Sequence, residues 1–140
     1  MRMRVLTQTK KGKLLAIADR LTKLIEADKD TDVIMPAYPC DGERLIIIVA
    51  SAKAAMPDSF CRFLRTISRN NTANIAFVID GTEENAKKIV DLTKDCNCNV
   101  IADNILYIKG GLPFKFAKSV TAEEIAAVEK WVGEIKASLA

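Results

Sequence analysis

Strand-like and helix-like patterns alternate along the whole chain, and this alternation restricts the fold more than any other feature. Apolar segments typical of strands are expected at Met3–Thr7, Asp32–Met35, Arg44–Ala50, Asn74–Ile79 and Val100–Ile108. Segments with apolar residues at helical spacing separate most of them, and a last one runs from Thr121 to the C-terminal region. The pattern predicts an α/β fold with three layers, in which helices cover both faces of a doubly wound, five-stranded parallel sheet.

Length and composition indicate one domain over residues 1–140. The chain has 140 residues, of which 49% are hydrophobic and 28% charged, as in ordinary soluble domains. Its longest apolar run, Leu45 to Ala50, is far too short to cross a membrane and suits a strand buried on both faces. The N-terminal residues show no signal-peptide core, so a cytoplasmic protein with no membrane partner is expected.

Several functional classes are disfavoured by the residues that the chain lacks. Without histidine there can be no Ser-His or Cys-His nucleophile pair and no histidine metal ligand. The four cysteines include Cys96 and Cys98, whose spacing does not fit a zinc knuckle, so no metal site is expected. A net charge of +3 with one lysine cluster and no interleaved aromatic residues does not favour nucleic-acid binding.

The strongest local signal for a ligand lies between the first strand and the first helix. The turn Thr9-Lys10-Lys11-Gly12-Lys13 follows an apolar strand and precedes an amphipathic helix expected over residues 13–27. Such a turn brings backbone N–H groups and a helix N-terminus to one point, where an anion can bind. Because parallel sheets bind ligands beyond the carboxyl ends of their strands, residues 8–13, 50–56 and 80–82 are the predicted site loops.

These features resemble the flavodoxin family of the short-chain type, and the resemblance covers nearly the whole chain. Thr9 and Gly12 fall on the hydroxyl residue and the glycine of the family's phosphate-binding turn. Ile46-Ile47-Ile48 with the small-residue loop after it is similar to the family's third strand and flavin-side loop. The resemblance implies the strand order 2-1-3-4-5.

The chain also departs from the family pattern. Lys11, Lys13 and Leu14 stand where flavodoxins usually have small polar residues and a threonine that bind the FMN phosphate. The second and third loops, residues 50–55 and 79–82, contain no aromatic residue that could pack on the flavin ring.

The resemblance implies a domain that binds FMN, or a related phosphate-bearing small molecule, at the carboxyl ends of the strands. Bound FMN would imply electron transfer with a redox protein partner, with the chemistry supplied by the flavin. No side chain is an evident general acid or base, so no catalytic residue is assigned and enzymatic activity stays undecided. The cofactor-binding residues expected on this basis are Thr9, Lys10, Lys11, Gly12, Lys13, Ser51, Ala52, Lys53, Asp80 and Gly81.

The alternative is a flavodoxin-like scaffold that has lost flavin and acts as a non-catalytic binding or assembly module.

Two other α/β folds fit the sequence less well. A phosphoacceptor receiver needs acidic residues where Thr7, Gln8 and Ala50 stand, and a Rossmann domain needs three glycines where only Gly12 is present. The oligomeric state does not follow from the sequence.

Overall fold

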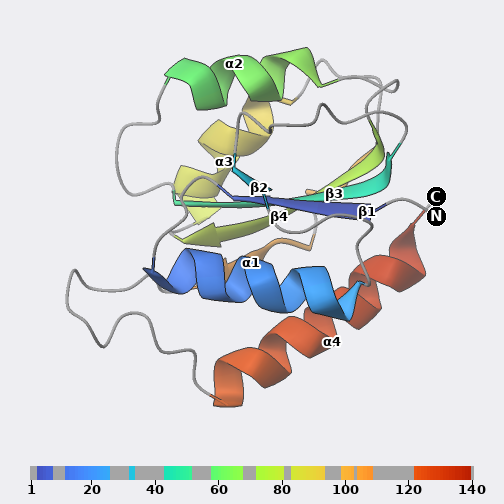
Figure 1. Ribbon diagram of the computed structural model, residues 1–140. Helices are drawn as coiled ribbons and strands as arrows, with labels where there is room; N and C mark the ends of the chain where they lie inside the picture. The colour runs from blue at the N-terminus through green and yellow to red at the C-terminus, as the bar shows by residue number, and fades with distance from the viewer. Residues whose placement is uncertain are drawn as a thin grey trace.

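The computed structural model shows four helices and six strands among the residues that it describes (Figure 1). The described residues are 3–7, 12–25, 32–33, 43–51, 58–67, 72–80, 83–93, 99–102, 104–108 and 122–139. The strands are β1 (Met3–Thr7), β2 (Asp32–Val33), β3 (Glu43–Ser51), β4 (Thr72–Asp80), β5 (Asn99–Val100) and β6 (Leu106–Ile108). The helices are α1 (Gly12–Leu24), α2 (Asp58–Thr66), α3 (Glu83–Asp91) and α4 (Ala122–Ser138).

All strand pairs of the sheet are parallel, as the alternation of strands and helices predicts. The strands lie in the order β2-β1-β3-β4-β5, and β6 also pairs with β4. The longest pairing joins β3 to β4, from Glu43 opposite Thr72 to Ser51 opposite Asp80. Both strands are therefore central, which agrees with their nearly continuous apolar sequences.

The prediction of one fifth strand over Val100–Ile108 is wrong. β5 pairs with Asn74 and Ile75 at one end of β4, whereas β6 pairs with residues 78–80 at the other end. Between them, the Ala102 N–H donates to the carbonyl of Val100 at 3.0 Å, a local turn that an extended strand cannot form. The described part of the sheet consequently has six strands rather than five.

The helices form a layer on each face of the sheet (Figure 1). α1 and α4 cover one face, and α2 and α3 cover the other. The side chains of β3 alternate accordingly, because Ile47 belongs to the core under α1 and α4, while its neighbours Ile46 and Ile48 belong to the core under α2 and α3. All three are fully buried, and full burial of such a side chain stabilises the fold by about 1.5–3 kcal/mol.

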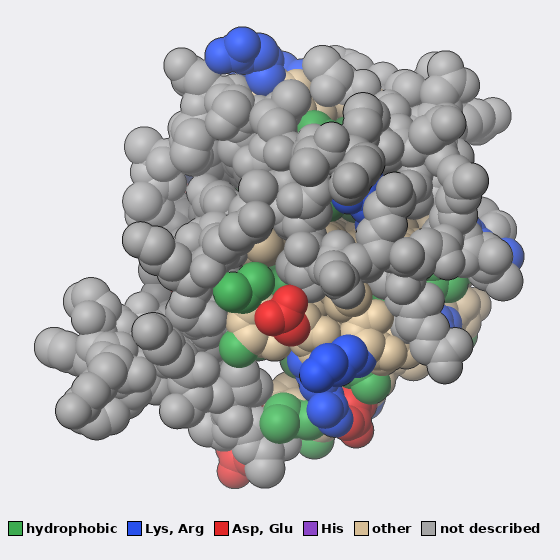
Figure 2. Space-filling view, in the orientation of Figure 1, with side chains coloured by type: hydrophobic (Ala, Val, Ile, Leu, Met, Phe, Trp, Pro, Cys, Tyr) green, Lys and Arg blue, Asp and Glu red, His purple; other side chains and the backbone are tan. Residues whose placement is uncertain are grey.

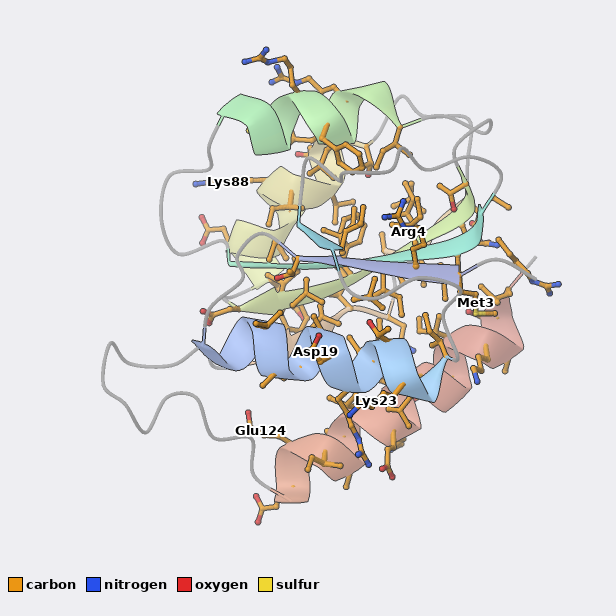
Figure 3. The ribbon with its side chains drawn as sticks, viewed as in Figure 1. Met3, Arg4, Asp19, Lys23, Lys88 and Glu124 are labelled. Atoms are coloured by element: carbon orange, nitrogen blue, oxygen red, sulfur yellow. The ribbon has the colours of Figure 1, made fainter. Side chains whose placement is uncertain are left out.

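One charged side chain interrupts the apolar core on the α2 and α3 face. Arg4 in β1 is only 2% exposed and points from the sheet toward the helices above it, opposite in direction to Met3 (Figure 3). Arg4 lies opposite Ile46 in the register of β1 and β3. The arginine occupies the position that the strand period assigns to the buried face, so its long aliphatic stem takes the place of an apolar side chain there.

Candidate functional site at the carboxyl edge of the sheet

Three strands end close together at one edge of the sheet, and this is the edge at which the sequence predicts a ligand site. β1 ends at Thr7, which lies opposite Val49, and two residues later β3 ends at Ser51 opposite Asp80. α1 begins at Gly12 soon after β1 ends, and α3 begins at Glu83 soon after β4 ends. Strand ends and helix starts therefore meet at this edge.

Two polar side chains at this edge are buried. Thr7 is fully buried and Asp80 is 6% exposed, and each takes part in a polar or electrostatic interaction. Val5 and Val78, two residues earlier on the same strands, belong to the core under α1 and α4. Because side chains of a strand alternate, Thr7 and Asp80 lie on that same face, the side of the sheet on which α1 lies.

The expected binding residues are described in part. Gly12 and Lys13 are the first two residues of α1, and Ser51 and Asp80 are the last residues of β3 and β4. The structure thus brings Ser51 and Asp80 together as register partners. The remaining predicted residues, Thr9, Lys10, Lys11, Ala52, Lys53 and Gly81, lie outside the described residues.

The charges of the helix N-termini distinguish α1 from α3 as a place for an anion. The first turn of α1 contains no acidic residue, whereas the first turn of α3 contains Glu83 and Glu84. The free N–H groups and partial positive charge of an N-terminus attract anions. The carboxylates of Glu83 and Glu84 oppose that attraction at α3, so an anion is favoured at α1.

Sequence reasoning did not assign Thr7 to the site. The sequence predicts Thr7 as the last residue of the first strand, where its hydroxyl ends an otherwise largely apolar segment. Its hydroxyl is a hydrogen-bonding group that is completely buried at the carboxyl end of β1. A hydroxyl residue directly after an apolar strand is the signal that points to it.

Two further classes of site are absent from the described part of the chain. No three His, Cys, Asp or Glu side chains among the described residues lie close enough together to hold a metal ion. None of the described helices combines the length and the apolar character that a membrane span requires.

Comparison with known proteins gives no relative for this chain. No family model, no curated protein and no solved structure matches it.

Proposed function

We propose that the chain is a flavodoxin-like domain that binds FMN, or a related phosphate-bearing ligand, at the carboxyl edge of its sheet. The observation that carries the proposal is the arrangement at this edge. Thr7, Ser51 and Asp80 end three adjacent strands there, beside the N-terminus of a helix without acidic residues in its first turn. Phosphates bind at such N-termini in many α/β proteins.

The order of the strands supports the same location for the ligand. After β1 the chain moves outward to β2, and it then crosses to β3 on the other side of β1. The ends of β1 and β3 therefore flank a topological switch point, where open α/β sheets bind their ligands. With β5 and β6 taken as two parts of one interrupted strand, we assign the flavodoxin-like order 2-1-3-4-5 to this sheet.

In this proposal one part of the site binds the phosphate of the ligand and another part binds the hydroxyl groups of its sugar-like chain. The turn from Thr9 to Lys13 holds the phosphate through backbone N–H groups and lysine ammonium groups. A buried carboxylate repels phosphate but accepts hydrogen bonds from hydroxyl groups, so Asp80, with Gly81, contacts the sugar-like part of the ligand. Residues 51–53 border the ring, and a bound flavin would supply electron transfer with a redox protein partner.

Calorimetric titration of FMN, riboflavin and inorganic phosphate into two matched charge-reversal variants tests the proposal. The first variant is K10E/K11E/K13E, and the control is K23E/K88E/K130E, which changes the net charge equally at exposed helical positions. We expect the first variant to lose affinity for FMN and phosphate, while the control stays close to wild type. Equal losses in both variants would show that the turn is not the anchor, and a wild type that binds neither FMN nor phosphate would overturn the proposal.

A non-catalytic binding or assembly module remains the second candidate. The observation that favours it is the lack of aromatic residues in the loops that follow the third and fourth predicted strands. Stacking on aromatic side chains contributes about 0.5–1.5 kcal/mol per ring pair beyond burial, so a flavin ring would be held weakly there. A purified protein without the visible absorbance of oxidised flavin, and without a thermal shift on addition of FMN, is the result expected for this candidate.

A further inference from the structure

A hollow with a volume of about 510 Å³ lies between α3 and the segment that joins β5 to β6. It is lined by Glu83, Lys87, Val90, Ala102, Asn104, Ile105 and Tyr107. None of these residues is among the binding residues proposed above, although Glu83 begins α3 at the same edge of the sheet. The volume is within the range of small-molecule sites, which is about 300–1,000 Å³.

The hollow exists because the edge of the sheet is interrupted. The N–H of Ile101, directly after β5, still donates to the carbonyl of Ile75 in β4 at 2.9 Å. The chain then leaves β4 and pairs with it again at Leu106, opposite Val78. The wall opposite belongs to one face of α3, since Glu83, Lys87 and Val90 are spaced at about one helical turn. The break in the fifth strand and the facing helix form the two sides of the hollow, which is open to solvent.

Both walls are fixed to the body of the protein. The carbonyl of Asn104 accepts a hydrogen bond from Nε1 of Trp131 at 2.9 Å, and Trp131 is only 3% exposed in the core under α4. On the other side, Ala86 and Ile89 of α3 are fully buried against the opposite face of the sheet. A site built on walls that are already ordered loses little conformational entropy when a ligand binds.

The lining combines an apolar surface with opposite charges. Val90, Ala102 and Ile105 supply apolar contacts, and the ring of Tyr107, which is 39% exposed, adds an aromatic surface. The phenol of Tyr107 is protonated at neutral pH and can donate a hydrogen bond. Burial, and then the carboxylate of Glu83, raise its pKa above the ordinary value of 10.0. Glu83 and Lys87 place one negative and one positive charge a helical turn apart.

We propose that this hollow binds a small aromatic zwitterion of the α-amino acid class. Its ring would pack against Tyr107 and the apolar lining, its carboxylate would face Lys87, and its ammonium group would face Glu83. A ligand with only one of these charges would meet one attractive and one repulsive group. The site therefore selects for the presence of both charges on one small aromatic molecule.

The test compares probes that share a phenyl ring and differ in charge. L-phenylalanine, 3-phenylpropanoate and phenethylamine are titrated into the ¹⁵N-labelled protein, with L-leucine as the non-aromatic zwitterion. Trp131 is the only tryptophan, so its single indole N–H signal reports on the bond to Asn104. Because a partly exposed charge pair contributes about 0.2–1 kcal/mol, we expect L-phenylalanine to bind about 1.4-fold to fivefold more tightly than either singly charged probe.

Matched variants on one helix identify the residues responsible. Glu83→Gln should abolish the preference for L-phenylalanine over 3-phenylpropanoate, and Lys87→Gln should abolish the preference over phenethylamine. Glu84→Gln and Lys88→Gln should preserve both preferences, because these two residues are equally exposed but do not line the hollow. Lys88 extends outward from α3 (Figure 3). Tyr107→Ala should weaken all phenyl probes, and Tyr107→Phe, which retains the ring, should retain most of the binding.

Three results would overturn the proposal. The first is the absence of chemical-shift changes at the lining residues when L-phenylalanine is added. The second is equal affinity of the wild type for the three phenyl probes. The third is an equal loss of the preference for L-phenylalanine in the variants at positions 83 and 87 and in the controls at positions 84 and 88. Circular dichroism of each variant verifies that these outcomes are measured on folded protein.

Discussion

Asn99 donates a hydrogen bond from its Nδ2 to the Oδ1 of Asn74 at 2.9 Å, and this bond joins the side chains of β5 and β4. Asn74 is fully buried, and its own Nδ2 donates to the backbone carbonyl of Arg44 in β3 at 2.8 Å. One asparagine side chain thus connects three adjacent strands near the amino ends of β3 and β4. Thr72 adds a bond from its hydroxyl to the carbonyl of Asn74 at 2.7 Å.

Replacement of Asn74 by alanine should destabilise the protein more than replacement of Asn99. Asn74→Ala removes two hydrogen bonds and a buried side chain, so the free energy of unfolding should fall by about 2–3 kcal/mol. Asn99 is exposed, but its loss leaves the buried Oδ1 of Asn74 without this donor, and Asn99→Ala should cost about 1 kcal/mol. Urea unfolding measures both values.

The exposed neighbour Ala73 offers a control for this pair of variants. Ala73→Ser on the same strand should change the free energy of unfolding by no more than about 0.5 kcal/mol. An Asn74→Ala variant as stable as this control would show that the three-strand connection does not stabilise the sheet.

Trp131 links α4 to the segment before β6, and its substitution should separate hydrogen bonding from packing. Trp131→Phe keeps most of the apolar contact but removes the donor to the Asn104 carbonyl, so it should cost about 1–2 kcal/mol. Trp131→Ala also creates a cavity in the core and should cost about 3–5 kcal/mol. Because Trp131 is the only tryptophan, unfolding should be followed by circular dichroism. Equal losses in the two variants would contradict a separate contribution from the hydrogen bond.

The central sheet could be predicted from the sequence because local patterns determine it. The apolar runs of β3 and β4 are typical of strands buried on both faces, and the structure confirms parallel strands at those positions. The role of Asn74 could not be predicted, because its bonds depend on the register with Arg44 and Asn99, residues distant in the chain. Because β3 and β4 are buried on both faces, their hydrophobic pattern alone does not determine that register.

The candidate site was predictable at the strand ends, whereas the hollow was not. Parallel topology alone implies that Ser51 and Asp80 share an edge, and their register confirms it. The hollow depends on the turn at Ala102. The apolar pattern from Val100 to Ile108 predicts one continuous strand there and gives no indication of a turn. The dipeptide Asp103-Asn104 within that pattern is the available signal, since both residues favour turns and are rare in strands.

Tyr107 should titrate above its ordinary pKa of 10.0, because burial and the Glu83 carboxylate both disfavour the phenolate. Spectrophotometric titration of a Tyr38→Phe background leaves Tyr107 as the only tyrosine and measures this pKa directly. Addition of Glu83→Gln should lower the pKa, but not fully to 10.0, because burial is the larger cause. A pKa that is unchanged by Glu83→Gln would contradict the electrostatic contribution.

The same shift predicts how stability depends on pH. Because the pKa of Tyr107 is higher in the folded protein than in the unfolded chain, ionisation of this tyrosine favours unfolding. The contribution of the neutral phenol to stability is therefore complete below the pKa of the unfolded chain, near 10.0. This contribution is lost as the pH rises from there through the higher pKa of the folded protein. Tyr107→Phe, which has no titrating hydroxyl, should show a smaller loss of stability above pH 10.0 than the parent protein. Identical pH profiles would contradict the shift.

The ion pair between Arg20 of α1 and Glu129 of α4 should contribute little to the packing of these helices. Its Nη2–Oε1 distance is 2.9 Å, but the two side chains are 44% and 48% exposed. Figure 2 shows acidic and basic side chains next to one another on this surface. A double-mutant cycle with Arg20→Ala and Glu129→Ala should give a coupling free energy of about 0.2–1 kcal/mol that decreases at high salt.

The ion pair should contribute little because apolar packing holds α1 and α4 together. Ile17 and Leu21 of α1 and Val128 and Val132 of α4 belong to one buried core, and burial of each such side chain contributes about 1.5–3 kcal/mol. Leu21→Ala should therefore reduce the free energy of unfolding by about 2–5 kcal/mol, several times the effect of the charge pair. A coupling above about 2 kcal/mol that persists in 1 M salt would show instead that the ion pair is a principal contact between α1 and α4.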